Sequence, residues 1–311
     1  MTYPWGDNRR FNSYNRFLQQ QFGKRAQKIT LDAGFTCPNR DGTAGTGGCS
    51  YCLNAAFNPS YSSADKPVAQ QLQEGMDFHR KRYQGDTYIA YFQAFSNTHA
   101  PLEKLREIYR PAIEHPQVKG IVIGTRPDCV DEGKLDFFAE LQRRMFVSIE
   151  YGVESCHDKT LRRINRGHNF ECACKAIRLT ADRGIHCAAH FIYGLPSETP
   201  DLWFNDLREI NALPIDSVKF HQLQIIKGTS MQQDFEANPT DFHLFTKDEY
   251  IRFIVRITER LNPAFAIERF AGSVPPRFLY TNNWERERYD VLLHKIEKRM
   301  EELDTYQGKK F

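Results

Sequence analysis

Short apolar runs alternate with helical patterns along most of this chain, and this alternation limits its possible folds more than any other feature. The expected strands are Lys28–Asp32, Tyr88–Ala94, Gly120–Gly124, Phe146–Gly152, His186–Tyr193 and Ser217–Leu223. The helical patterns between them are Val68–Tyr83, Leu102–His115, Glu132–Arg143, Lys159–Ile164, Glu171–Arg183 and Pro200–Ala212. Such alternation predicts a parallel sheet with covering helices. Six units are too few for a closed eight-stranded barrel, so we expect an α/β fold, a partial (β/α)6 TIM-like barrel.

The alternation fades after about Gly228, and the last third of the chain is expected to form an α/β extension. An amphipathic helix is predicted over Thr246–Asn262 with Thr246 as N-cap, a strand over Ala264–Phe270 and a charged helix over Glu285–Leu303. The tail YQGKKF is expected to be frayed. This divides the chain into an N-terminal extension (1–27), the partial barrel (28–228) and a C-terminal extension (229–311) that is a candidate substrate- or RNA-binding region.

Composition sets few further limits. The 311 residues carry a net charge of only +3, which implies no particular partner, and eight cysteines are too sparse for a disulfide scaffold. The N-terminal run MTYPWGDNRRFNSYNRF has no apolar signal core, and no run approaches the ~18 apolar residues needed to span a bilayer. We therefore expect a soluble cytoplasmic protein with reduced thiols and no membrane partner.

Three cysteines directly follow the first expected strand, at the end where barrel folds carry their chemistry. They are Cys37, Cys49 and Cys52, in the run CPNRDGTAGTGGCSYC. Three thiolates are one ligand short of a closed four-coordinate site, which favours a [4Fe–4S] cluster with one open iron. A structural zinc site is the alternative, but no Cys or His lies between Cys52 and His79 to complete it. A phosphate-binding loop is not favoured, because GK[ST] and GxGxxG are both missing.

Several further segments carry a family resemblance: YFQAFSNT, IEYGVES, LRRINRGH and FIYGLPSET. Together with the CxφC cysteine pair (φ, aromatic), they resemble the radical S-adenosylmethionine (SAM) enzymes. The chain is most similar to the bacterial YhcC-type branch, which is related to the catalytic subunit of Elongator. The resemblance implies a [4Fe–4S] cluster bound by Cys37, Cys49 and Cys52, with SAM on the fourth iron.

The resemblance also assigns cofactor-binding residues. Tyr51 is expected at the adenine, and the turn with Ala94, Phe95 and Ser96 at the methionine amino group. Thr125, Arg126 and His190 are expected at the ribose. Glu154 and Arg166 are also expected to contact SAM. Arg166 would pair with the SAM carboxylate, as an arginine fork does. Glu154 and Arg166 could instead form a structural ion pair, Glu150 could replace Glu154, and His190 could be a hydrogen-bonded core residue.

The activity implied by the resemblance is reductive cleavage of SAM to a 5′-deoxyadenosyl radical, with electrons from a donor such as flavodoxin or ferredoxin. Relatives in the Elongator branch modify the wobble uridine side chain of tRNA, which makes tRNA the expected partner. Some bacterial members convert its carboxymethylaminomethyl group to aminomethyl. The alternative is a small-molecule substrate such as a tetrapyrrole, because IYGLP also occurs in anaerobic coproporphyrinogen oxidases. Those enzymes have a tighter cysteine spacing.

Residues expected to face the substrate are Tyr193, Lys219 and His221, with ordinary polar packing as the alternative. Basic and aromatic residues interleave towards the C-terminus, which is compatible with RNA binding or with a solvated mixed-charge helix. They are Arg269, Arg277, Arg286, Arg288, Lys295, Lys298 and Arg299, with Phe270, Phe278, Tyr280, Trp284 and Tyr289. The remaining cysteines, Cys129, Cys156, Cys172, Cys174 and Cys187, are either ligands of an auxiliary cluster or small buried side chains.

Overall fold

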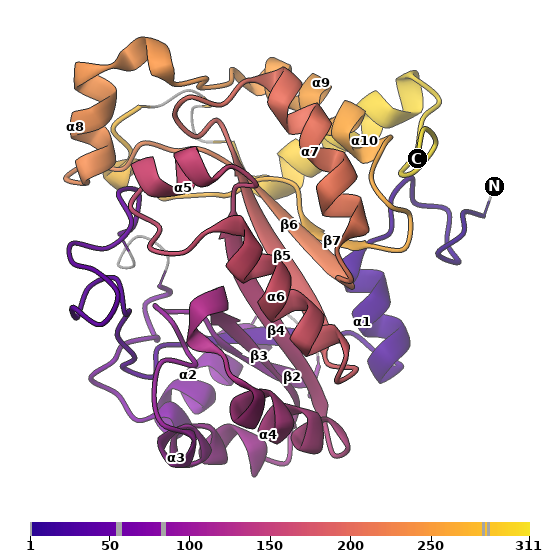
Figure 1. Cartoon of the computed structure of the whole chain (residues 1–311). Coiled ribbons are helices and arrows are strands. Elements are labelled where there is room, and N and C mark those ends of the chain that lie inside the picture. The colour runs from indigo at the N-terminus through magenta and orange to yellow at the C-terminus, as the bar shows by residue number, and fades with distance from the viewer. Residues whose placement is uncertain (1, 54–57, 82–84, 282–283, 285–286) are drawn as a thin grey trace.

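The computed structural model describes residues 2–53, 58–81, 85–281, 284 and 287–311. Its strands form one parallel sheet in the order β1-β2-β3-β4-β5-β6-β7. The strands are β1 Gln27–Leu31, β2 Tyr88–Phe92, β3 Val118–Thr125, β4 Phe146–Glu154, β5 His186–Tyr193, β6 Ser217–Gln222 and β7 Ala266–Arg269. Because neighbouring strands follow each other in sequence, the sheet curls into a half-barrel with helices around it (Figure 1).

The covering helices match the predicted helical patterns within a few residues at each end. They are α2 Val68–Arg80, α3 Leu102–Ile113, α4 Glu132–Gln142, α5 Asp158–Arg163, α6 Phe170–Ala181 and α7 Pro200–Ala212. The last two residues of the predicted helix Val68–Tyr83 lie outside the described residues. Local signals explain the boundaries: Asp131, Asn169 and Thr199 each cap a helix by accepting a backbone N–H from the first turn.

The C-terminal extension adds helices α8 Ser230–Ala237, α9 Lys247–Thr258 and α10 Tyr289–Glu302, together with β7. Thr246 caps α9 in a capping box with Glu249, as the sequence predicts. The sequence gives no sign that β7 belongs to the barrel sheet, yet it pairs in parallel with β6 through Ser217 and Ala266. The half-barrel therefore has seven strands rather than six, and the extension supplies one of them.

The N-terminal segment contains a helix that the sequence analysis did not predict, α1 Tyr14–Phe22. Tyr14 and Leu18 pack against Ile89 and Tyr91 of β2 and Ala266 of β7. These strand residues face the concave side of the sheet, so α1 lies within the half-barrel between its two edge strands. It forms one wall of the cavity described below.

The chain terminus, expected to be frayed, is packed, and that expectation is wrong. Gln307 is fully buried, and its side chain donates to the carbonyls of Asn262 at 2.8 Å and Phe265 at 2.9 Å. Its Oε1 accepts the Asn12 N–H at 2.8 Å. A polar side chain is stable in the interior when its hydrogen bonds are complete. The tail thus joins both ends of the chain, which lie on the same side of the molecule in Figure 1.

In the part of the chain that the structure describes, we find no helix with the length and apolar character that crossing a membrane requires.

Candidate active site

A cavity of about 540 Å³ opens on the concave side of the sheet. Its lining brings together all the predicted site residues except Ala94 and Tyr193. Those it includes are Cys37, Cys49, Tyr51, Cys52, Phe95, Ser96, Thr125, Arg126, Glu154, Arg166, His190, Lys219 and His221. Ala94 is buried beside the cavity in the same turn as Phe95 and Ser96.

The expectation that Tyr193 faces the cavity is wrong. Its ring packs on the outer side of the sheet, against Phe220 at 5.5 Å and Phe253 of α9 at 4.9 Å between ring centroids. Side chains alternate between the two faces of a strand, so residues 190 and 193 must point to opposite faces. His190 faces the cavity, and Tyr193 therefore belongs to the core.

The cysteine loop is held in place by residues that follow β4. Asn165 donates from Nδ2 to the carbonyls of Thr46 at 3.1 Å and Gly48 at 2.8 Å. Asn39 in turn donates to the Asn165 carbonyl. Gly48 has a φ of 78°, a conformation that costs glycine nothing. The loop can therefore pass closely around the site, with Cys37 and Cys49 buried and Cys52 half-buried.

Arg166 connects this loop to the sheet. Its Nη1 lies 3.4 Å from the Cys49 sulfur, and its Nη2 donates to the Gly152 carbonyl at 2.6 Å and lies 3.5 Å from Glu154 Oε1. A Cβ at position 152 would collide with Glu154 Oε1 and come within 2.6 Å of Arg166 Nη2, so glycine lets these two side chains lie against the strand. Glu154 and Arg166 thus form the ion pair that the sequence left open, beside the cysteines.

The backbone around this pair adopts conformations that side-chain-bearing residues rarely take. Phe95, Glu154 and Asn165 have φ values of 60°, 71° and 51°. Phe95 and Glu154 line the cavity, and Asn165 directly precedes Arg166. Each such residue costs of order 1–3 kcal/mol and persists where the surroundings force it, most often at functional sites.

Arg126 lines the cavity, but its guanidinium already has partners. It forms a bidentate pair with Asp128 at 2.8 and 2.6 Å and donates to the Arg166 carbonyl at 2.6 Å. Thr125 Oγ1 is hydrogen-bonded to Thr98 Oγ1 at 2.6 Å. The main effect of Arg126 in this geometry is to fix the segment that carries Arg166.

A buried network of charges occupies the other side of the cavity. The Glu150 carboxylate on β4 has no exposed surface and bonds Lys28 of β1 and Lys219 of β6, both at 2.8 Å, and His190 at 3.2 Å. Glu268 of β7 also pairs with both lysines, at 2.8 and 3.4 Å. The network therefore joins the two edge strands of the half-barrel across its interior.

The network shifts the pKa values of its members. Burial raises the pKa of Glu150, but the Lys219 and Lys28 ammonium groups lower it by more, so it lies well below its usual range. Burial and Glu150 raise the pKa of Glu268. Burial and Lys219 lower the pKa of His190 to about 4. Burial, His190 and Arg269 lower the pKa of His221 well below its usual range, so both imidazoles are neutral at pH 7.

Lys28, Glu268 and Arg269 line the cavity, but the sequence analysis did not place them there. A signal was present for the first two: each is an ionisable residue inside a strand of a sheet whose two faces are covered. Charged side chains are almost never fully buried unless they are paired. An unexplained charge in such a strand therefore indicates a partner on a neighbouring strand or a polar cavity.

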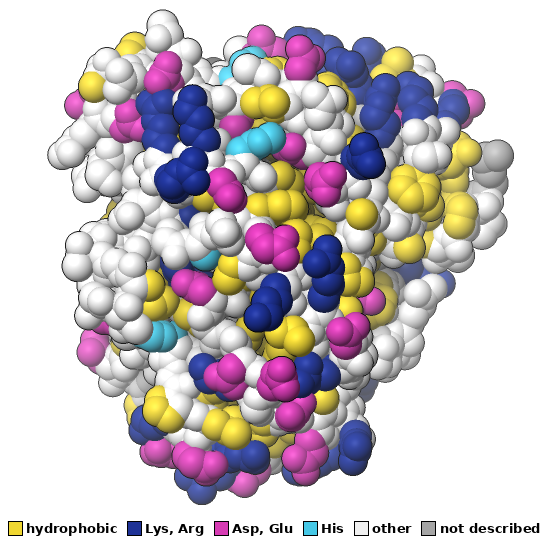
Figure 2. Space-filling view, viewed as in Figure 1, with side chains coloured by type: hydrophobic (Ala, Val, Ile, Leu, Met, Phe, Trp, Pro, Cys, Tyr) yellow, Lys and Arg dark blue, Asp and Glu magenta, His cyan; other side chains and the backbone are white. Residues whose placement is uncertain are grey.

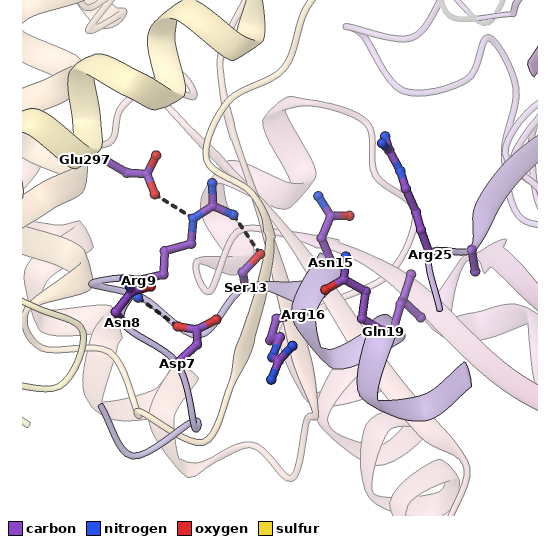
Figure 3. A pocket seen from close by; sticks show the side chains of 11 residues that line it. Asp7, Asn8, Arg9, Ser13, Asn15, Arg16, Gln19, Arg25 and Glu297 are labelled. Carbon is purple, nitrogen blue, oxygen red and sulfur yellow. Dashed lines mark hydrogen bonds and ion pairs between the residues drawn. The ribbon is translucent and has the colours of Figure 1, made fainter. Parts of the chain in front are cut away.

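A second hollow, of about 690 Å³, lies beside α1 (Figure 3). It shares Asn15, Leu18, Arg25 and Ala26 with the lining of the main cavity, so the two adjoin along α1. Arg9 in its wall is held by Glu297 at 2.6 Å and by Ser13 at 3.2 Å. The hollow thus connects the packed chain ends with the concave side of the sheet.

The remaining cysteines do not gather into a second site. Cys187 and Cys174 are core residues, Cys156 packs against the core, Cys129 is buried, and Cys172 lies half-buried on α6. Across residues 2–53, 58–81, 85–281, 284 and 287–311, no three His, Cys, Asp or Glu side chains converge as ligands of a single ion would. A [4Fe–4S] cluster does not require its cysteines to converge on one ion, because each thiolate binds a different iron.

Comparison with known proteins identifies the family. The model of the radical SAM superfamily matches residues 40–209, and that of a radical SAM C-terminal domain matches residues 215–302. The chain belongs to the radical SAM superfamily. It is 33% identical to YtqA of Bacillus subtilis over 310 residues, which cover 99% of this chain and 95% of YtqA. It is 38% identical to Escherichia coli YhcC over 229 residues, 73% of this chain and 72% of YhcC.

This radical SAM protein is also similar to the Elongator subunit. It is 29% identical to Elongator complex protein 3 of Schizosaccharomyces pombe over 160 residues, 50% of this chain but only 28% of that protein. The solved structure of Elp3 from Methanocaldococcus infernus covers 91% of this chain and 64% of its own, with a TM-score of 0.67 and 16% identity. The half-barrel fold is therefore shared with Elp3.

Radical SAM proteins use a [4Fe–4S] cluster and SAM, and the residues of this cavity fit both. Three cysteines that form no disulfide line it, and Arg166 Nε is buried without a hydrogen-bond partner among the described residues. An unsatisfied guanidinium N–H beside the cysteines suits the carboxylate of SAM. Cys37, Cys49 and Cys52 would hold the cluster, and Arg166, Tyr51 and the Phe95–Ser96 turn would hold SAM.

Proposed function

We propose that this radical SAM protein modifies a wobble uridine side chain in tRNA. The observation that carries the proposal is the sequence similarity to Elongator complex protein 3 over half the chain. This chain spans only 28% of that protein, so the proposal concerns the radical SAM step alone. Cys37, Cys49 and Cys52 would hold the cluster, which would supply the electron for reductive cleavage of SAM next to the substrate.

In this proposal the chain's residues divide the cavity into two parts. The cysteine loop and Arg166 hold the cofactors on one side. The wall formed by β6 and β7, with Lys219 and His221, faces the wobble nucleotide on the other. The charge network keeps Lys219 fixed by Glu150 and Glu268, so its role is to position the wall rather than to move a proton.

The surface offers basic side chains to RNA phosphates, although fewer than the sequence suggested. Arg288, the N-cap of α10, and Lys295 and Arg299 within this helix pair with carboxylates and form the mixed-charge helix of the alternative interpretation. Arg286 lies outside the described residues. Figure 2 shows Lys and Arg side chains gathered around α7 and α9 at the upper edge of that face, where Arg252 and Arg256 are exposed. Such a basic edge can bind a phosphate backbone.

The aromatic residues of the interleaved pattern are mostly structural. Phe270 is fully buried and donates its N–H to the Tyr289 hydroxyl at 3.1 Å, and Trp284 packs on Tyr250. Tyr280 is exposed near Arg277, which lies over the Phe278 ring. The loop with Arg277, Phe278 and Tyr280 is therefore a part of the C-terminal extension that can contact an unpaired base.

The first test is anaerobic reconstitution with iron and sulfide, followed by SAM and dithionite, with 5′-deoxyadenosine as the readout. Wild type should release 5′-deoxyadenosine, and Cys49→Ala should lose both the cluster absorbance and the product. Cys172→Ala is the matched control, because this cysteine lies on α6 outside the cavity and its loss should leave the iron content unchanged. Equal product from Cys49→Ala would contradict the assignment of the cluster ligands.

The second test addresses the substrate. Purified protein is incubated with total tRNA from a strain that lacks the gene, with flavodoxin or ferredoxin as electron donor, and tRNA nucleosides are measured by mass spectrometry. We expect a change confined to a wobble uridine, in wild type only. If the protein cleaves SAM but neither binds tRNA nor alters any nucleoside, the substrate proposal is wrong and a small-molecule substrate takes its place.

A further inference from the structure

The charges in the β6–β7 part of the cavity do not balance. Lys28 and Lys219 share the carboxylates of Glu150 and Glu268, which accounts for two cations and two anions. Arg269, the last residue of β7, lines the same cavity and adds a third cation. His190 and His221 are neutral there and contribute no charge. This wall therefore carries an excess positive charge.

That excess charge is located on Arg269. Among the residues that the structure describes, its guanidinium has no ion pair or hydrogen bond and lies 5.5 Å from the centre of the Tyr289 ring. A face-on aromatic contact leaves the N–H groups at the edge of the guanidinium available to a ligand. The pairing of β6 with β7 shifts register between Val218 and Lys219, so that Arg269 pairs with Lys219, and Glu268 and Arg269 both line the cavity.

His221 is the neighbour that would share a ligand with Arg269. The Arg269 charge acts on its ring, as does His190, whose ring centroid lies 6.0 Å away. The backbone at Gly272 leaves room for the ring, since a Cβ there would come within 2.7 Å of His221 Nδ1. A neutral imidazole keeps one N–H donor, so Arg269 and His221 together present donors and an uncompensated charge.

We propose that Arg269 and His221 bind a carboxylate at the end of the substrate's side chain, which makes Arg269 a specificity-determining residue. This inference rests on the proposed function. We do not assign the carboxylate of SAM to Arg269, because Arg166 beside Cys49 is in position to bind it. A backbone phosphate of RNA fits less well, since it is flanked by ribose on both sides, whereas a terminal carboxylate reaches the half-buried Arg269 guanidinium directly.

A second atom in the same wall favours a substrate that also carries an amine. Glu268 Oε1 is buried without a hydrogen-bond partner among the described residues. A carboxylate oxygen is an acceptor, and leaving it unpaired in the interior is costly. An amine next to the carboxylate would satisfy it, so the wall suits a short amino-acid-like group on the uridine.

The test compares two tRNAs of identical sequence on the reconstituted holoprotein. One carries 5-carboxymethylaminomethyluridine at the wobble position and the other 5-aminomethyluridine, so they differ by one carboxymethyl group. Equilibrium binding is measured for wild type, Arg269→Gln and Arg269→Lys. We expect wild type to prefer the carboxylated tRNA by about tenfold to one-hundredfold, the range for a hydrogen bond to a charged group. Arg269→Gln should bind both equally, and Arg269→Lys should keep part of the preference.

Arg277→Gln is the matched control, because Arg277 is exposed in the adjacent loop and lies outside the lining of the cavity. It should weaken binding of both tRNAs by the same factor and leave the preference intact. Iron content and melting temperature of each variant establish that it is folded and loaded. Equal binding of both tRNAs by wild type, or an undiminished preference in Arg269→Gln, overturns the inference while tRNA binding stands. Failure of wild type to bind either tRNA overturns the proposed function and the inference together.

Discussion

Glu150 is the side chain on which the charge network of the cavity depends. Its carboxylate is fully buried and has three partners, Lys28, Lys219 and His190. Removing one member of a buried ion pair leaves its partners desolvated and uncompensated. Glu150→Gln should therefore lower the free energy of unfolding by about 3–5 kcal/mol, measured by urea denaturation.

A surface pair provides the control for Glu150. Lys24 and Asp86 are 2.5 Å apart, but both side chains are more than half exposed. Water already solvates such charges, so Asp86→Asn should leave the unfolding midpoint unchanged. If Glu150→Gln also left the unfolding midpoint unchanged, the network would not contribute to stability in the way its geometry implies.

His186 supplies a pH dependence that is separate from the metal site. Its ring packs among Tyr14, Phe17 and Phe146, and burial lowers its pKa to about 4 despite the nearby Asp216 carboxylate. The unfolded chain, with a pKa of about 6.5, binds the proton first as the pH falls. Stability is therefore complete above about pH 6.5 and is lost progressively towards pH 4, by about 2 kcal/mol at pH 5.

The measurement for His186 is the difference in unfolding free energy between pH 7 and pH 5. His186→Phe keeps the aromatic packing and has no proton to bind, so its loss between the two pH values should be smaller by about 2 kcal/mol. Lys28 and Glu150, which also act on His186, are present in both proteins and cancel. An identical pH dependence in both would show that His186 does not titrate as a buried neutral group.

At the scale of elements, two glycines on helices should respond in opposite directions to alanine. Gly75 of α2 faces β1, and a Cβ there would collide with Ile29 and lie 3.0 Å from the Tyr61 ring. Overpacking of this kind costs about 1–3 kcal/mol, more than the ~1 kcal/mol of helix propensity gained. Gly75→Ala should therefore destabilise the protein by about 1–2 kcal/mol in thermal or urea unfolding.

Gly133 in the first turn of α4 is the matched case. It is exposed, and the nearest atom to an added Cβ is Asp131 Oδ1 at 3.6 Å, an ordinary contact. Gly133→Ala should therefore stabilise the protein by up to about 1 kcal/mol. A stabilising Gly75→Ala would mean that β1 moves away from α2 at little cost.

The elements also show what could be predicted from the sequence. Predictions were accurate where local chemistry sets the limits: Thr199 with Pro200 begins α7, and Thr246 with Glu249 begins α9. They failed where distant segments decide. The four residues of β7 are too few to indicate which strand it pairs with, and α1 has no side-chain cap bond at Ser13. Gln307 is buried only because its side chain is hydrogen-bonded to the Asn12 N–H and the Asn262 carbonyl.

In the candidate site, too, the residues of local motifs could be predicted, and the pairing of distant residues could not. Cys37, Cys49, Cys52 and Arg166 carry motif chemistry and could be named from the sequence. Which of two glutamates lies beside Arg166 could not be decided, because both belong to β4 and both face the cavity. The structure separates them: Glu154 pairs with Arg166, and Glu150 pairs with the lysines.

At the scale of the whole molecule, the three parts assigned from sequence share one core. A single hydrophobic cluster contains Phe11 of the N-terminal extension, Ile29 and Phe220 of the barrel, and Phe270 and Met300 of the C-terminal extension. The two family models meet near residue 215, between α7 and β6, yet β6 pairs with strands on both sides. The boundaries at 28 and 228 therefore mark changes in sequence pattern, and we expect no independent folding unit between them.

This expectation can be tested by comparing the whole chain with a fragment of residues 28–228. The whole chain should unfold in one cooperative transition, coincident by circular dichroism and tryptophan fluorescence. The fragment lacks β7, which leaves the hydrogen-bonding edge of β6 open, and lacks the α9 residues that cover Tyr193 and Trp203. Open strand edges and exposed aromatic surface favour aggregation, so the fragment should be insoluble or unfold without cooperativity. A soluble fragment with its own sharp transition would instead show that the barrel folds first and that the extension, with its arginine at the cavity wall, docks onto it.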